Sequence, residues 1–257
     1  MKASIVIANY NNAQFINECI NSLNSQTYNN IEIIFFDDNS QDNSIEIIEK
    51  FKNVKVVKND IQTNFGSINQ INAFKKSIEL CTGDVIFFLD SDDYFHKSKI
   101  EKIVNQFLED SEKMVVFDFP IILKNKKEII KKKRDSLLKT YWGYIHPTSC
   151  ISIRKEIVNK IFDSTLNDNF KDIWLDLRIL LFSKNLLNYK IINDNLTYYR
   201  QTEDNVSSKF KKYSKNWWKR RSQAHEYFHA FCNKNDIKFT KNLDYLFTKL
   251  ICFCFKR

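Results

Sequence analysis

The chain has 257 residues, of which 43% are hydrophobic and 28% charged, and its formal net charge is +9. This composition excludes global disorder, and the length suits one large domain or one domain with a small appendage. Glycine occurs only three times, which excludes the glycine-rich loops of Rossmann dehydrogenases and P-loop ATPases.

Short apolar runs alternate with helical patterns in the first half of the chain, which is typical of a layered α/β sheet. Gly83 is predicted to end a helix in the left-handed conformation that only glycine adopts without strain. The apolar spacing predicts strands at 4–8, 31–36, 54–57 and 84–89, and helices at 15–23, 45–51 and 71–78.

The second half of the chain is less regular. The patterns predict strands at 114–119 and 196–199, a solvated hairpin or loop in the lysine-rich stretch after residue 119, and helices at 173–183 and from Phe210 onward. We therefore expect a sheet-based domain over 1–205, with halves 1–110 and 111–205, followed by a helical extension over 206–257.

Cysteine usage and the absence of targeting signals indicate a cytoplasmic protein. The six cysteines include no C-x-x-C pair, and the N-terminus runs directly into a strand pattern without a signal peptide. The pair Cys252 and Cys254 lacks a second ligand pair, so we interpret all six as reduced thiols rather than metal ligands. No stretch reaches the roughly 18 unbroken apolar residues of a membrane helix.

The basic residues concentrate in two segments. Residues 124–134 contain seven basic side chains and one acidic one, and residues 209–221 contain seven basic side chains and no acid. A solvated surface is one interpretation of such runs. The other is peripheral contact with the anionic inner face of the cell membrane, which Trp217 and Trp218 would favour as interfacial side chains. A nucleic-acid binder is an alternative because the pI is 9.1.

Carboxylates follow two of the predicted strands. Asp37 and Asp38 end the second strand, and Asp90, Asp92 and Asp93 follow the fourth. Turn preference explains one such cluster, but two of them at strand ends favour a ligand site. Crowded carboxylates repel unless a cation joins them, and Mg²⁺ or Mn²⁺ prefers oxygen ligands together with substrate phosphates. The sequence therefore predicts a metal–diphosphate site, which also argues against nucleic-acid binding.

Several ordered motifs in roughly the first 110 residues resemble those of the family 2 glycosyltransferases. They are IVIANYNN at 5–12, SQTY at 25–28, DDNSQD at 37–42, NFG at 64–66, Asn72, and GDVIFFLDSDD at 83–93. The resemblance implies a GT-A fold, which is a mixed sheet flanked by helices, and an inverting glycosyltransferase. It further implies Mn²⁺ or Mg²⁺, a UDP-linked hexose or N-acetylhexosamine as donor, and a glycan or lipid-linked acceptor in cell-surface polysaccharide or lipooligosaccharide assembly. A non-catalytic sugar-nucleotide sensor is the remaining alternative.

The resemblance also assigns roles to residues of the nucleotide half. Asp38 would bind the edge of the nucleobase, and the segment from Ala8 to Tyr10 would pack along the base. Asp90 would face the ribose and the metal, and Asp92 would ligate the metal.

The general base is expected in the second half of the chain. The segment KDIWLDLR at 171–178 resembles the family's Glu-Asp motif, with an arginine six residues after the aspartate. This spacing makes Asp172 the predicted base, and Asp176 remains open as the alternative because only the acceptor geometry decides between them. Lys171 replaces the family's glutamate, and Thr202 stands where the family often carries a histidine metal ligand.

Overall fold

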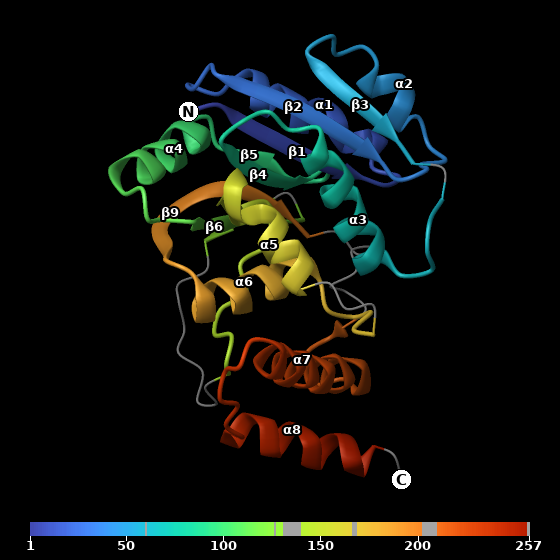
Figure 1. The fold of residues 1–257 in the computed structure, drawn as a ribbon. Coiled ribbons are helices and arrows are strands. Elements are labelled where there is room, and N and C mark those ends of the chain that lie inside the picture. The colour runs from blue at the N-terminus through green and yellow to red at the C-terminus, as the bar shows by residue number, and fades with distance from the viewer. Residues whose placement is uncertain (60, 126, 131–139, 166–168, 202–209, 256–257) are drawn as a thin grey trace.

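The computed structural model describes residues 1–59, 61–125, 127–130, 140–165, 169–201 and 210–255. Within these residues the chain forms a nine-stranded mixed sheet in the order β3-β2-β1-β4-β8-β6-β9-β5, with β7 paired to β6. Helices cover the sheet, and two C-terminal helices form a separate layer at the end of the molecule away from β1–β3 (Figure 1).

The first half of the chain forms the parallel part of the sheet, as predicted. Its strands are β1 (Ala3–Asn9), β2 (Ile31–Asp37), β3 (Val54–Lys58) and β4 (Val85–Asp90), and its helices are α1 (Ala13–Asn24), α2 (Ser44–Ile48) and α3 (Gly66–Glu79). Strand β1 lies between β2 and β4, so the chain changes direction across the sheet at β1. Such a switch point opens a crevice at the carboxyl ends of the strands.

From residue 94 to residue 200 the chain adds antiparallel strand pairs and further helices. Strand β8 runs antiparallel to both β4 and β6, whereas β9 runs parallel to β6. The elements are β5 (Tyr94–Phe95), α4 (Lys99–Glu109), β6 (Val115–Lys124), β7 (Lys127–Ile130), a 3₁₀ turn (Thr148–Cys150), β8 (Ile151–Arg154), α5 (Lys155–Thr165), α6 (Leu175–Leu186) and β9 (Tyr189–Arg200).

Several of these elements extend or correct the sequence prediction. The exposed strand β7 pairs with β6 and confirms a solvated hairpin in the lysine-rich stretch, although residues 131–134 lie outside the described residues. Helices α4 and α5 and strand β8 were not predicted, and β9 is three times as long as the four residues expected at 196–199. The long pairing of β9 with β6 supplies the additional strand residues.

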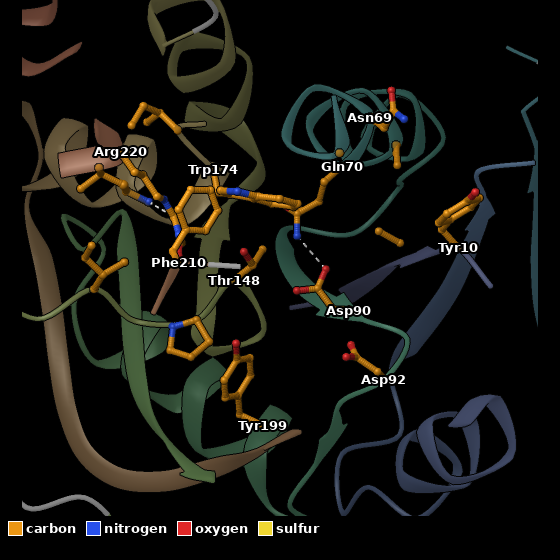
Figure 2. A pocket seen from close by; sticks show the side chains of 18 of the residues that line it. Tyr10, Asn69, Gln70, Asp90, Asp92, Thr148, Trp174, Tyr199, Phe210 and Arg220 are labelled. Atoms are coloured by element: carbon orange, nitrogen blue, oxygen red, sulfur yellow. Dashed lines mark hydrogen bonds between the residues drawn. The ribbon is translucent and has the colours of Figure 1, made fainter. Parts of the chain in front are cut away.

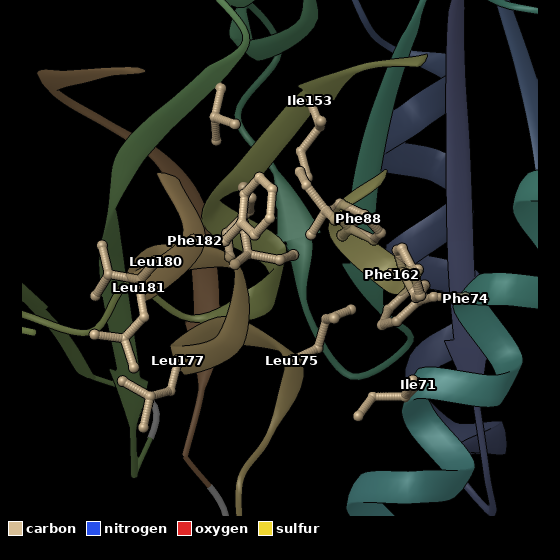
Figure 3. Close-up of a cluster of buried hydrophobic side chains, with 14 of the residues drawn as sticks. Ile71, Phe74, Phe88, Ile153, Phe162, Leu175, Leu177, Leu180, Leu181 and Phe182 are labelled. Carbon is tan, nitrogen blue, oxygen red and sulfur yellow. The ribbon is translucent and has the colours of Figure 1, made fainter. Parts of the chain in front are cut away.

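The core consists of two apolar clusters, one on each face of the sheet. Successive strand residues point to opposite faces, so Phe88 packs with Phe74 of α3 and Phe182 of α6, whereas Phe87 and Leu89 pack on the other side. The rings of Phe74 and Phe88 lie edge to face with centroids 5.0 Å apart (Figure 3). The helices on both faces are thereby fixed against the sheet.

The predicted role of Gly83 is wrong. Its φ is outside the left-handed region, and α3 ends earlier, at Glu79, with Leu80 as a right-handed cap. The position instead requires a residue without a side chain, because a Cβ would lie 2.5 Å from Ser4 Oγ and 2.8 Å from the Lys2 carbonyl oxygen. Close approach of two backbone segments, and not backbone conformation, explains this glycine.

The C-terminal region consists of α7 (Lys215–Lys234) and α8 (Leu243–Cys254). Helix α7 packs Ala224, Phe228 and Phe231 into the core beneath α6, and α8 packs on the outer side of α7 (Figure 1). The predicted boundary at 205 falls within residues 202–209, outside the described part of the chain. No helix among the described residues is both long enough and apolar enough to span a bilayer.

Candidate active site

A cleft of about 1000 Å³ opens at the switch point of the sheet. The ends of β1, β2 and β4 form one wall, and α6 and α7 contribute to the opposite wall. Figure 2 shows Tyr10, Asp90 and Asp92 on one side of this space and Trp174, Phe210 and Arg220 on the other. Because Ala8 pairs directly with Asp90 in the sheet, the two predicted ligand-binding segments are adjacent.

The two aspartates at the end of β2 have different environments. Asp37 is buried and serves the turn, since its carboxylate accepts hydrogen bonds from Asn9 Nδ2 at 2.8 Å and from the Ser40 amide at 2.9 Å. Asp38 lines the cleft and accepts from Asn59 Nδ2 at 2.7 Å and Gln62 Nε2 at 2.9 Å. The structure therefore brings Ala8, Tyr10 and Asp38 together in the cleft and leaves Asp37 with a structural role.

Asp90 and Asp92 face the cleft from the end of β4. Burial, followed by the charge of Asp92, raises the pKa of Asp90 to about 7, although Gln70 donates a hydrogen bond to its carboxylate at 2.8 Å. Burial raises the pKa of Asp92 to about 6 against the attraction of Arg200. Burial thus disfavours the ionised form of both carboxyl groups, and a bound cation would favour it.

Asp93, the third carboxylate of this cluster, is held inside the protein. It accepts hydrogen bonds from Ser149 Oγ at 2.6 Å and from the Arg200 amide at 2.8 Å. Burial and the charges of Asp92 and Asp90 raise the pKa of Asp93. Ser149 also accepts from the Asp90 amide at 3.0 Å, so a single serine connects the buried carboxylate to the segment that faces the cleft.

The donor set fits a divalent cation held together with a substrate. Among the described residues no group of three histidine, cysteine or acidic side chains is arranged to hold a metal, and Thr202 lies outside them. The available protein ligands are the carboxylates of Asp90 and Asp92. Two carboxylates completed by diphosphate oxygens and water are a common arrangement for Mg²⁺, and oxygen donors also suit Mn²⁺.

The cleft distinguishes the two aspartates considered for the general base. Asp176, in the first turn of α6, lines the cleft, whereas Asp172 is half-buried and is not among the described residues that line it. Burial raises the pKa of Asp176, and the Arg220 charge opposes this shift. The Asp176 charge in turn raises the pKa of Asp90, so these two carboxyl groups share one electrostatic environment. Asp172 is fixed through its backbone, with its amide 2.8 Å from Gln223 Oε1 and its carbonyl accepting from Arg220 Nε at 3.1 Å.

The wall opposite Asp90 and Asp92 is aromatic and basic, which the sequence motifs did not predict. The Arg220 guanidinium lies 4.7 Å from the centre of the Phe210 ring. A Cβ on Gly66 would lie 3.3 Å from the Trp174 ring, so the glycine leaves room for this tryptophan. Further aromatic residues that line the cleft are Trp142, Tyr144, Tyr199 and Trp217. In the sequence, the signal for this surface was the alternation of aromatic and basic residues in 209–221.

Comparison with known proteins identifies the family. The model of the glycosyl transferase family 2 matches residues 4–173. An uncharacterised glycosyltransferase of Nostoc sp. is 33% identical over 78% of this chain and 65% of its own length, and the glycosyltransferase GlyG of Streptococcus pneumoniae is 29% identical over 79% of this chain and 72% of its own. The chain therefore spans about two thirds of the length of these relatives.

The fold has counterparts among solved structures. Staphylococcus aureus TarS, named a poly(ribitol-phosphate) β-N-acetylglucosaminyltransferase and solved in complex with UDP, superimposes with a TM-score of 0.66 and 17% identity. The match covers 88% of this chain and 65% of that structure. The family model matches more than half of the chain, so the chain belongs to the family 2 glycosyltransferases. Its mixed sheet with flanking helices superimposes on that of TarS, which gives it a GT-A fold.

Proposed function

We propose that the cleft binds a UDP-sugar and transfers the sugar, with inversion, to a hydroxyl of a glycan or lipid-linked acceptor in cell-surface polymer assembly. The observation that carries this proposal is the convergence of Asp38, Asp90 and Asp176 on one cleft at the switch point of the sheet. The UDP complex of TarS and the polymer named in its activity support a UDP-linked donor and a cell-surface acceptor.

Asp90 and Asp92 would hold Mn²⁺ or Mg²⁺ beside the donor diphosphate. The metal, when bound, supplies Lewis-acid stabilisation of the leaving diphosphate, an effect typically worth several kcal/mol. Tyr10, whose side chain is 50% exposed at the cleft, is free to pack along the nucleobase, and Asp38 lies where it can accept from the edge of that base.

The aromatic and basic wall would bind the acceptor. Trp174 and Phe210 offer apolar faces to a sugar ring, and Arg220 offers a positive charge in the same part of the cleft. Attack from this side would meet the donor on the face opposite its diphosphate, which is the geometry that inversion requires.

Asp176 is the general base that the cleft geometry favours, in place of the sequence prediction of Asp172. Its carboxylate would take the proton from the attacking hydroxyl, and a pKa raised by burial brings its basicity closer to neutral pH. The Arg220 charge opposes the rise in the pKa of Asp176 and would help to keep the base ionised. A positioned base of this kind typically contributes about 10²–10⁴-fold to the rate.

The assignment is tested by a matched pair of variants at the start of α6 and in the turn before it. Asp176→Asn and Asp172→Asn remove one carboxylate each and hardly change side-chain volume. We expect Asp176→Asn to lower turnover of the UDP-sugar at least about a hundredfold with UDP affinity nearly unchanged, and Asp172→Asn to retain most activity. The reverse pattern would restore Asp172 as the base, and full activity of both variants would exclude this mechanism.

We further propose that the enzyme acts in the cytoplasm, with peripheral contact to the inner face of the cell membrane. The exposed lysines of the segment 210–221 support this contact, because anionic lipids attract basic residues near the surface.

A further inference from the structure

Helix α8 exposes much of an apolar face. Its buried side, formed by Asp244 and Thr248, packs on α7. Side chains at steps of three and four residues lie on one side of a helix. On the opposite side the helix exposes Leu243 (76%), Leu246 (52%), Phe247 (46%), Leu250 (61%) and Phe253 (57%). This set is called the α8 stripe below.

A large apolar area of this kind indicates an interaction surface, because proteins rarely leave contiguous apolar patches exposed. The α8 stripe contains no charged side chain. Lys249, at its margin, is paired with Glu226 of α7 and with Ser222, so it holds α8 on α7. Within the described part of the chain the stripe is thus fixed in place as an outward-facing surface.

Basic and aromatic side chains lie beside the α8 stripe. The rings of Trp218 and Phe247 are 5.9 Å apart, and Cys252 Sγ lies 3.4 Å from the Trp218 carbonyl oxygen, which brings the start of α7 against α8. The Tyr213 ring lies 6.5 Å from the Trp218 ring, and Lys212 Nζ lies 4.7 Å from the centre of the Tyr213 ring. Lys211, Lys215 and Lys219 are exposed close to Lys212 in the sequence. The result is an apolar stripe with a cluster of lysines next to it.

This combination matches the interface of an anionic bilayer better than a second copy of the chain. An interfacial helix buries an apolar face at the acyl boundary while neighbouring lysines contact anionic headgroups. An isologous dimer that buries the stripe would set the neighbouring lysines against the same surface of the second copy, where the stripe offers no acidic side chain to pair with them, whereas anionic headgroups would pair with them. Charge complementarity therefore selects the membrane.

We infer that α8 is an interfacial membrane-binding helix, with the α8 stripe seated in an anionic lipid surface and the lysines of 211–219 on the headgroups. The inference deepens the membrane contact of the proposed function. Lys215 and Lys219 lie at the start of α7, and the same helix contributes Trp217 and Arg220 to the cleft. Docking through α8 would hold the acceptor side of the cleft near the membrane, where a lipid-linked acceptor resides.

Vesicle flotation tests this inference with a matched control. Native protein should float with vesicles of phosphatidylglycerol and phosphatidylethanolamine and much less with phosphatidylcholine alone. The double variant Leu246→Ser/Leu250→Ser should lower the apparent affinity at least about tenfold, because two apolar side chains leave the interface. Leu108→Ser on α4 is the matched control, because Leu108 and Leu250 are equally exposed at 61%. Leu108 lies outside the α8 stripe, so this variant should float as native protein does.

The lysines are tested by the fourfold change of Lys211, Lys212, Lys215 and Lys219 to Gln, which should weaken binding mainly at low salt. UDP-induced thermal stabilisation, measured on every variant, reports folding and donor binding separately. Retained UDP binding with no flotation of native protein would overturn only the role of α8, whereas flotation without UDP binding would count only against the proposed function. Flotation of the double leucine variant equal to that of native protein would overturn the inference. So would a native dimer that ignores vesicles and dissociates when these leucines are replaced.

Discussion

Replacement of Lys99 by methionine should destabilise the protein strongly, although Lys99 lies outside the cleft. The Lys99 and Asp118 side chains are fully buried and form an ion pair of 2.9 Å. Lys99 Nζ also donates to the Ser149 carbonyl oxygen and to Thr197 Oγ1, each at 2.6 Å, so all three ammonium protons have partners. Thr197 donates in turn to the other oxygen of Asp118 at 2.7 Å.

The magnitude follows from the charge that the substitution leaves behind. Methionine keeps most of the length of the lysine stem, so the main loss is the ammonium group, and Asp118 remains buried without its cation. Breaking a buried pair by removing one partner typically costs about 3–5 kcal/mol. For a chain of about this size each kcal/mol corresponds to about 2–4 °C in Tm, so we expect a decrease of about 6–20 °C.

Urea unfolding of Lys99→Met, Asp118→Leu, their double variant and Lys102→Met measures the effect. Lys102→Met, one turn along the same helix, removes an exposed pair with Asp194 and should cost no more than about 1 kcal/mol. The double variant Lys99→Met/Asp118→Leu removes both buried charges and should be more stable than Lys99→Met alone. A Lys99→Met variant within about 1 kcal/mol of native protein, or a double variant as unstable as the sum of the two single changes, would refute the reasoning.

Three further predictions concern the sheet and the cleft. Burial and the charge of Asp92 raise the pKa of Asp90 from 3.8 to about 7, so the metal-free native state holds a proton that the unfolded chain loses. Asp90→Asn should therefore raise Tm in EDTA by an amount that grows from about pH 4 to about pH 7 and then levels off, and a gain independent of pH in thermal scans would contradict this. Gly83→Ala should cost about 1–3 kcal/mol in urea unfolding, because the new Cβ would meet the Ser4 amide nitrogen of β1 and the carbonyl oxygen of Lys2, just before β1. An unchanged urea midpoint would show that the end of the strand can move. Asp38→Ala should weaken UDP binding about tenfold or more in calorimetry through loss of an acceptor, and unchanged affinity would remove Asp38 from the nucleotide site.

The parallel half of the fold could be predicted from sequence because each element there is specified locally. Strand β4 is a continuous apolar run that ends in Asp90, and α1 shows a regular apolar stripe at Ile16, Ile20 and Leu23. Strand β8 could not be predicted in this way. It has four residues, Ile151–Arg154, and it becomes a strand because β4 and β6 flank it on both sides. Long-range pairing of this kind leaves little trace in local periodicity.

The site shows the same division. Asp90 is the last residue of β4, and Asp38 and Asp92 follow β2 and β4 within two residues, so their positions at the edge of the sheet follow from topology. The side chains of the opposite wall come from distant segments, with Trp174 beside α6 and Arg220 on α7, and only packing brings them together. Asp176 lies in the first turn of α6, and Asp172 lies in the turn that precedes this helix. Spacing alone left both open, and of the two Asp176 lines the cleft.

Release of UDP from a panel of UDP-sugars, in Mn²⁺ and in EDTA, tests the central claim most directly. Native protein should release UDP from one or a few donors in Mn²⁺, the release should cease in EDTA, and both Asp92→Asn and Asp176→Asn should abolish it. Asp172→Asn, the matched control, should release UDP at nearly the native rate. Saturable UDP binding with no release from any donor, or release that is equal in Mn²⁺ and EDTA, would contradict a metal-assisted glycosyl transfer in this cleft.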